Sequence, residues 1–257
     1  MQVGLECMGD VDSFCVCEVV ELATLSLQSI SQNCVLDISH LGVLYGILDG
    51  CDLSSDQRRN LIRCIGEKNS HELEAYCCEY GISSEKADLL LQVSALCGKP
   101  DEVLTKLNEL LGETTAAKEL TELINTLDDN VLSIVNIDMS VVDDVSYYNG
   151  IVFKGFLAGV PSCVLSGGQY DRLMRKMGKD GKAVGFAVYL DMLERLCDNQ
   201  PLTDADVLLI YDPSVPASCV KSVADKLRSE GQSVEVRKDI PANKNYKRIE
   251  TLGEVKK

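Results

Sequence analysis

The fold is decided by two short stretches, Tyr147-Tyr148-Asn149-Gly150-Ile151-Val152-Phe153 and Gly167-Gly168-Gln169-Tyr170-Asp171-Arg172-Leu173. Taken singly, each has an ordinary structural explanation. Adjacent tyrosines in a strand usually serve cross-strand packing, and a Gly-Gly pair is usually a turn. Taken together they are specific, because particular residue types recur at many fixed offsets in one order.

The sequence on either side of these stretches predicts further strands and helices. Apolar periodicity ahead of them indicates a strand, an amphipathic helix and a buried strand, at Gln2–Met8, Ser13–Ile30 and Val35–Ile38. From Cys51 to Leu127 apolar residues recur at three- and four-residue steps, which predicts a wholly helical segment. Strand patterns then return at Leu132–Ile137, Ile151–Phe153, Ser162–Leu165 and Ala183–Val188, and a helix follows from Asp191.

A separate unit is predicted after Pro201. It comprises a strand at Val207–Tyr211, a helix from about Val215 to Ser229 and a strand at Ser233–Val236, which is a βαβ-like fragment. The tail from Asn243 is polar and weakly patterned. We therefore expect an incomplete C-terminal α/β unit.

The composition is that of a globular chain with one substantial core and a small appended domain. The chain has 257 residues, of which 46% are hydrophobic and 25% charged. The 40 acidic and 25 basic side chains give a net charge of −15, which argues against a nucleic-acid partner because such binding needs clustered positive charge. No basic-apolar leader and no stretch of about 18 apolar residues stands out. We expect a cytoplasmic protein with no membrane partner.

The cysteine pattern indicates neither a metal site nor a disulfide framework. Twelve cysteines occur without a Cys-x-x-Cys pair, and only two histidines, His40 and His71, could join them as metal ligands. We expect reduced cysteines that pack as small hydrophobic side chains, no metal and no cofactor.

The two stretches resemble the two histidine-specific signatures of histidyl-tRNA synthetases, which read roughly Arg-Gly-Leu-Asp-Tyr-Tyr-x-Gly-x-x-Phe and Gly-Gly-Arg-Tyr-Asp. The first strand, with Gln2 and Glu6, resembles the second half of motif 2 of class II synthetases, and Val184-Gly185-Phe186-Ala187 stands where motif 3 begins. The resemblance spans Gln2 to about Leu196, with a weaker echo of the anticodon-binding domain beyond Thr203.

This resemblance implies a fold and a histidine pocket. The fold would be α/β (α+β), with a mixed, mainly antiparallel sheet flanked by helices. Its domains would be a core at 1–50 and 130–200 that lacks its N-terminal part, a helical insertion at 51–129 and a partial anticodon-binding-like unit at 203–257. The implied histidine-binding residues are Gln2, Glu6, Tyr148 and Tyr170: a carboxylate for the ammonium group, and hydroxyls for the imidazole nitrogens.

The departures from the family argue against catalysis. Asp143 stands where the family has the arginine of its first signature, and no Lys, Arg or His lies between Lys118 and Lys154. In the family that arginine faces the substrate carboxylate and the α-phosphate of ATP; its loss removes roughly 4 kcal/mol of attraction at ~4 Å and an effective dielectric constant of ~20. Gln169 replaces the arginine of the second signature.

A third arginine depends on the alignment of motif 3. With Gly185-Phe186-Ala187 as the anchor, the motif 3 arginine position falls on Met192. A three-residue insertion would place Arg195 there instead. We favour Met192, because an insertion would break the strand-to-helix junction.

A retained amino-acid pocket without catalytic arginines is typical of the regulatory subunit of ATP phosphoribosyltransferase. The resemblance implies a non-catalytic protein of histidine biosynthesis that activates the short-form catalytic subunit in a hetero-oligomer and takes part in feedback regulation by free histidine. Two alternatives remain open: a divergent or truncated histidyl-tRNA synthetase, and a stand-alone histidine sensor. Because the similarity begins inside motif 2, we expect a shortened core with an unpaired sheet edge, and homodimerisation as in the family.

Overall fold

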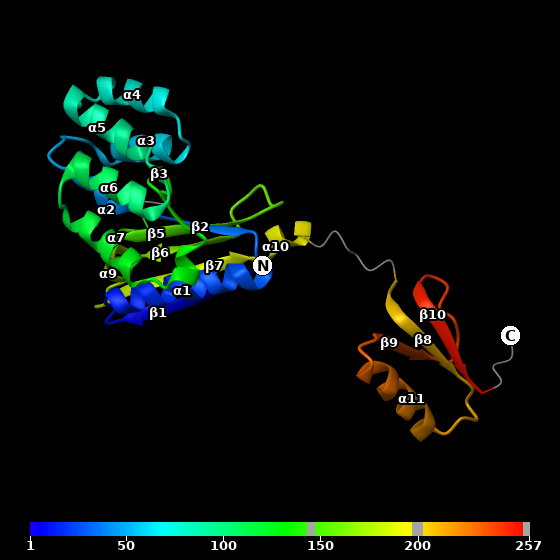
Figure 1. The fold of residues 1–257 in the computed structure, drawn as a ribbon. Coiled ribbons are helices and arrows are strands. Elements are labelled where there is room, and N and C mark those ends of the chain that lie inside the picture. The colour runs from blue at the N-terminus through cyan, green and yellow to red at the C-terminus, as the bar shows by residue number, and fades with distance from the viewer. Residues whose placement is uncertain (143–146, 197–202, 254–257) are drawn as a thin grey trace. The chain divides into compact units, whose positions relative to one another are not determined.

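A computed structural model of the chain describes residues 1–142, 147–196 and 203–253 (Figure 1). The chain divides into two compact units, Met1–Leu196 and Cys197–Lys257. Each unit has a sheet and a core of its own, so the two are described separately.

The first unit is built on a seven-stranded sheet with the order β1-β7-β6-β5-β2-β4-β3. All neighbouring strands are antiparallel except β2 and β4, which run parallel. This confirms the predicted mixed, mainly antiparallel sheet. The strands are β1 (Gln2–Gly9), β2 (Cys34–His40), β3 (Cys97–Gly98), β4 (Val135–Asp138), β5 (Ile151–Leu157), β6 (Leu165–Gln169) and β7 (Lys182–Tyr189).

Several helices of the first unit begin at polar caps. The Asp12 carboxylate accepts a hydrogen bond from the Cys15 amide at the start of α1, and Ser54 and Gln57 form a capping box at α3. The helices of the first unit are α1 (Ser13–Ile30), α2 (Leu41–Leu48), α3 (Ser55–Gly66), α4 (Ser70–Glu79), α5 (Ser84–Ser94), α6 (Pro100–Leu111), α7 (Thr115–Thr126), α8 (Asp129–Leu132), α9 (Asp171–Lys176) and α10 (Leu190–Leu193), followed by the 3₁₀ turn Glu194–Leu196.

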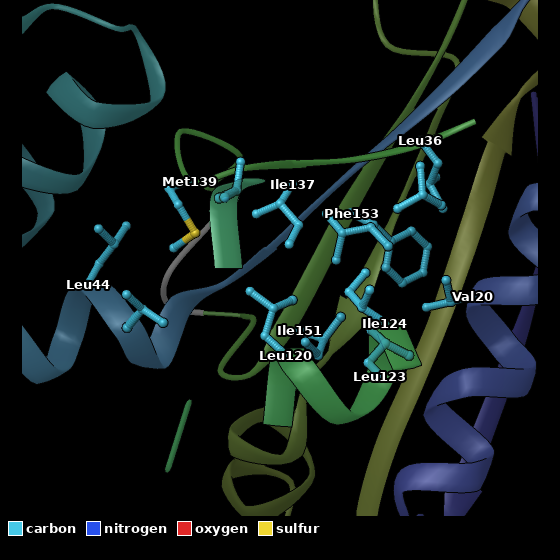
Figure 2. Packing of buried hydrophobic residues seen from close by; sticks show 14 of the residues in the cluster. Val20, Leu36, Leu44, Leu120, Leu123, Ile124, Ile137, Met139, Ile151 and Phe153 are labelled. Carbon is cyan, nitrogen blue, oxygen red and sulfur yellow. The ribbon is translucent and has the colours of Figure 1, made fainter. Parts of the chain in front are cut away.

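The main core lies between one face of the sheet and the helices α1 and α7. Phe153 is fully buried and points from β5 toward Val20 of α1 and Leu123 of α7 (Figure 2). Gly155, two residues along β5, leaves room for Leu27, because a Cβ atom there would lie 2.7 Å from a methyl carbon of that side chain. The spacing of apolar residues in β5 and α1 therefore places both elements against one another.

Helix α1 is long and apolar enough to cross a membrane by length and composition alone, although no such stretch was expected from the sequence. It also carries Glu18 and Glu21. Its buried residues pack against the sheet and α7, which makes it a helix of the core; they are Val16, Cys17, Val19, Val20, Ala23, Thr24 and Leu27.

Several predicted boundaries shift in the structure. The expected strand at Leu132–Ile137 begins only at Val135, since Asp129–Leu132 form the short helix α8. The Gly167–Gly168 pair is not a turn but lies inside β6, in register with Phe153 and Val152 of β5. A Gly-Gly pair typically forms a turn, but here close contacts with neighbouring strands and rings leave no room for a Cβ atom at either position within the strand.

The second unit is a three-stranded parallel sheet with one helix. Its elements are β8 (Ala205–Tyr211), α11 (Ala217–Ser229), β9 (Val234–Arg237) and β10 (Tyr246–Leu252), with the strand order β10-β8-β9. The expectation of an unpatterned tail was wrong for Tyr246–Leu252. As an edge strand, β10 buries few side chains, so it lacks the continuous apolar run that marks the central strand β8.

Candidate ligand-binding site

The sheet face opposite α1 carries a carboxylate and a tyrosine ring, each of which packs over a glycine. Glu6 in β1 is in register with Gly185 in β7, and Gly185 is in register with Gly168 in β6. A Cβ atom on Gly185 would collide with the Glu6 carboxylate, and one on Gly168 would lie 2.9 Å from the Tyr148 ring. The absence of side chains at these two positions makes room for Glu6 and Tyr148.

Three tyrosines gather beside this carboxylate. The Tyr170 hydroxyl donates a hydrogen bond to the Glu6 carboxylate. The Tyr147 ring lies 4.6 Å from the Tyr148 ring and 5.1 Å from the Tyr170 ring, between centroids. Glu6, Tyr147, Tyr148 and Tyr170, which we call the tyrosine cluster, thus combine one negative charge with aromatic walls.

Burial sets the protonation of the hydroxyls in the tyrosine cluster. Burial raises the pKa of Tyr170, and the hydrogen bond to Glu6 raises it further. Burial also raises the pKa of Tyr147, with a smaller contribution from the charge of Glu6. Both phenols therefore remain protonated donors over the physiological range of pH.

Of the predicted histidine-binding residues, the structure brings together Glu6, Tyr148 and Tyr170, but not Gln2. Gln2 shares the face of β1 with Glu6 and is in register with Tyr189 at the other end of β7. Glu6 lies four positions along the strand from Gln2, a distance of about 13 Å. Tyr147 was not among the predicted histidine-binding residues, but its ring packs against Tyr148 and Tyr170 in the cluster.

Gln169 does not face the tyrosine cluster. Successive residues of a strand point to opposite faces, so Gln169 lies on the α1 side while Tyr170 lies on the other. The side-chain oxygen of Gln169 accepts a hydrogen bond of 2.7 Å from the Ile151 amide. Gln169, predicted as an altered catalytic position, therefore lies on the other side of the sheet from the tyrosines.

The other two altered positions differ in what the structure says of them. Asp143 lies outside the described residues. Met192 lies in α10, directly after β7, and is half-buried against the main core. A methionine that packs into the core offers no charge to a nucleotide at this junction.

Two cations that the sequence analysis did not consider lie on the face or margin of this site. Arg172 at the start of α9 places its guanidinium 5.2 Å from the ring centroid of Tyr45, which packs with Tyr148 against one small apolar cluster. Lys154, two residues after Val152 in β5, points to the same sheet face. Neither could be found from spacing alone, because their neighbours come from distant parts of the sequence.

The described residues contain no group of three or more His, Cys, Asp or Glu side chains placed to hold a metal ion. Within the same residues no disulfide joins the cysteines. The chemistry available to the tyrosine cluster is therefore hydrogen bonding, charge pairing and aromatic contact by Glu6 and the tyrosines.

The sequence matches a known family. The family model of histidyl-tRNA synthetase matches residues 1–193. The chain belongs to the histidyl-tRNA synthetase family. Among curated relatives, an ATP phosphoribosyltransferase regulatory subunit from Acetivibrio thermocellus is 28% identical over 267 residues, covering 100% of this chain and 64% of the relative. A histidine–tRNA ligase from Methanocaldococcus jannaschii is 28% identical over 269 residues, covering 98% of this chain and 64% of the ligase. The chain thus spans less than two thirds of the length of these relatives.

Solved structures share the fold. An ATP phosphoribosyltransferase regulatory subunit/histidyl-tRNA synthetase from Bacillus halodurans aligns with a TM-score of 0.79 at 24% identity, covering 98% of this chain and 68% of that one. The ATP phosphoribosyl transferase (HisG:HisZ) complex from Thermotoga maritima aligns with a TM-score of 0.57 at 19% identity, covering 73% of this chain and 65% of that one. Both likenesses confirm a class II synthetase-like architecture.

Proposed function

We propose that this protein is a non-catalytic regulatory subunit of ATP phosphoribosyltransferase and binds free histidine at the tyrosine cluster. The observation that carries the proposal is the space that Gly185 and Gly168, which lack side chains, leave for Glu6 and Tyr148. A carboxylate that is held in place beside protonated phenols fits a small ligand that has both an ammonium group and an imidazole ring.

The cluster offers histidine complementary contacts. The Glu6 side-chain oxygens can accept hydrogen bonds from an ammonium group or an imidazole N–H, and the tyrosine rings supply apolar surfaces for the heterocycle. Gln2 lies on the same face of β1, and only a ligand long enough to extend along the strand from Glu6 would contact it. Arg172 at the margin is the candidate partner for the ligand's α-carboxylate.

The sequence around the site supports a role without adenylation. Asp143 stands where the family has an arginine, and no basic side chain occurs between Lys118 and Lys154. Met192 adds no charge at the junction after β7. ATP activation needs positive charge where the phosphates react, so we expect histidine binding without adenylate formation.

The partner proposal rests on relatives. The name of the Acetivibrio relative and the composition of the Thermotoga complex support assembly with a catalytic ATP phosphoribosyltransferase subunit in histidine biosynthesis. A regulatory effect of histidine would require different affinities in two quaternary states, because a ligand shifts an equilibrium only by its differential affinity. A cytoplasmic location, a homodimer and the absence of a nucleic-acid partner belong to the same proposal.

Titration calorimetry of the full chain with histidine tests the site. We expect saturable histidine binding, weakened about tenfold or more by Glu6→Gln and severalfold by Tyr170→Phe. Tyr211→Phe, in the second unit, is the matched control and should leave the affinity unchanged. If wild type shows no saturable heat, or if all three variants bind alike, the tyrosine cluster is not the histidine site.

The alternative function is that of a histidine–tRNA ligase, favoured by the 28% identity to the Methanocaldococcus enzyme. Histidine-dependent exchange between pyrophosphate and ATP separates the two: robust exchange would contradict the regulatory role. Co-purification with a short-form catalytic subunit separates that role from a stand-alone histidine sensor.

A further inference from the structure

A cavity lies on the opposite side of the sheet from the tyrosine cluster. It has a volume of about 430 Å³ and is walled by the start of α1, the helix α7 and the adjoining ends of β2, β5, β6 and β7. Small-molecule sites commonly occupy about 300–1,000 Å³. Gln169 lines this cavity, while the next residue, Tyr170, belongs to the tyrosine cluster, so the two sites lie back to back across the end of β6.

The lining of the cavity carries a net negative charge, and its carboxylates differ in the contacts they make with the protein. Its lining includes four carboxylates, from Asp12, Glu119, Glu122 and Asp171, against one ammonium group, that of Lys182. Asp12 already caps α1 through the Cys15 amide, at 2.9 Å. Asp171 accepts hydrogen bonds from the Ala183 amide at 3.0 Å and from Asn149 at 3.3 Å. These two carboxylates are committed to the fold.

Glu119 and Glu122 are the carboxylates left to face a ligand. They lie three residues apart on one face of α7, where like charges repel each other. The Glu122 carboxylate has no hydrogen bond or ion pair to any residue in the described part of the chain. The Glu119 side chain is 56% exposed and uses its Oε2 atom for one bond, to His40.

His40 holds Glu119 in a fixed orientation. His40 is buried, and its Nδ1 accepts a hydrogen bond of 3.0 Å from the Gly42 amide, which leaves the ring proton on Nε2. Nε2 then donates to Glu119 Oε2 at 2.8 Å. The hydrogen bond from His40 lowers the pKa of Glu119, and the nearby Lys182 ammonium lowers it further, so Glu119 is a carboxylate at neutral pH. A buried side chain thus positions a charged group at the cavity wall.

We propose that this cavity binds a compact organic cation, a primary amine on a short carbon chain. The ammonium group lies between Glu119 and Glu122 and the carbon chain follows the apolar part of the wall, formed by Val11, Val16, Leu123 and Ile151. A metal ion fits poorly, since the described residues hold no group of three metal ligands. An anion fits poorly because the lining is negative. The site does not depend on histidine binding by the tyrosine cluster.

Calorimetric titration of the full chain with 1,4-diaminobutane tests the site. We expect saturable one-to-one binding that Glu119→Gln/Glu122→Gln weakens about tenfold or more. Glutamine keeps an acceptor for His40, so the fold should be retained. Glu122→Gln alone, which breaks no contact within the described residues, should weaken binding severalfold.

The matched control is Glu74→Gln/Glu79→Gln, which makes the same charge change on the exposed surface of α4. It should change the affinity less than about twofold, and Tyr170→Phe should leave it unchanged. Equal losses in the two double variants would mean diffuse attraction to an acidic protein and would overturn the proposal. The absence of saturable binding to wild type would overturn it as well.

Discussion

At the residue scale, the candidate site depends on two glycines that leave space for its side chains. Gly185 and Gly168 stand in register on neighbouring strands, and each leaves space for a side chain from elsewhere. The motif patterns pointed to Glu6 and Tyr148 but not to the reason that these side chains can occupy the sheet surface. That reason is the missing Cβ atoms beneath them.

Gly185→Ala should therefore destabilise the first unit by about 1–3 kcal/mol, because the new methyl group meets both the Glu6 carboxylate and the Leu5 carbonyl oxygen, 2.5 Å away. Urea unfolding followed by circular dichroism measures the change. Gly46→Ala is the control, since a Cβ atom on this exposed glycine of α2 meets nothing within 4 Å. We expect it to stabilise the protein by about 0.5–1 kcal/mol. Equal effects of the two substitutions would contradict the steric explanation.

At the element scale, side chains of the second unit show how exposed charges can hold its strands. The Glu235 carboxylate of β9 accepts hydrogen bonds from the Tyr246 hydroxyl of β10 at 2.8 Å, from Arg237 at 2.5 Å and from Lys244 at 3.0 Å. The bonds from Tyr246 and Lys244 link β9 to β10 and the residues just before it, whereas Arg237 belongs to β9 itself. They also explain why a polar stretch such as Tyr246–Leu252 can form a strand.

The hydrogen bond from Tyr246, with those from Arg237 and Lys244, lowers the pKa of Glu235 from 4.5 to about 2. Because the pKa of Glu235 is lower in the folded state than in the unfolded state, the carboxylate stabilises the folded state at pH values above about 4.5. This contribution disappears as the pH falls from about 4.5 to about 2. Titration of the Glu235 carboxyl carbon by NMR should give the low midpoint. Glu235→Gln should remove this part of the acid dependence of unfolding. A midpoint near 4.5 would show that the contacts do not persist in solution.

At the scale of the whole molecule, the chain has two hydrophobic cores of different size. The first unit buries large apolar side chains between the sheet and α1 and α7 (Figure 2). The second has a small cluster around Leu209, Val220 and Ala224. Each core is made of residues from its own unit.

Phe153→Ala should cost the first unit about 3–5 kcal/mol, because it empties a fully buried site. Hydrogen exchange followed by mass spectrometry can resolve the effect by segment. Peptides from α1, β2 and β5 should exchange faster, while those from 205–252 keep their wild-type rates. Faster exchange in both units would show that they unfold together.

Much of the first unit could be predicted from its sequence, since strands and helices such as Gln2–Gly9 and Ser13–Ile30 follow local apolar periods. The pairing of Glu6 with Tyr170 was foreseen only as part of a motif. The placement of Gln169 could not be foreseen, because the motif gives its neighbours in sequence but not the face on which it points. The edge strand β10 was missed because it buries too little surface to leave an apolar pattern.

The sequence by itself determined the synthetase-like fold, the presence of Tyr148 and Tyr170 in the two signature stretches, and the lack of basic residues between Lys118 and Lys154. Only the tertiary structure decided that Gln169 and Tyr170 serve opposite sides of the sheet, that glycines lie beneath Glu6 and Tyr148, and that His40 meets Glu119. The physical reason is that local periodicity fixes the type of an element and its apolar face. Contacts between faces depend on strand register and packing, which join residues far apart in the chain.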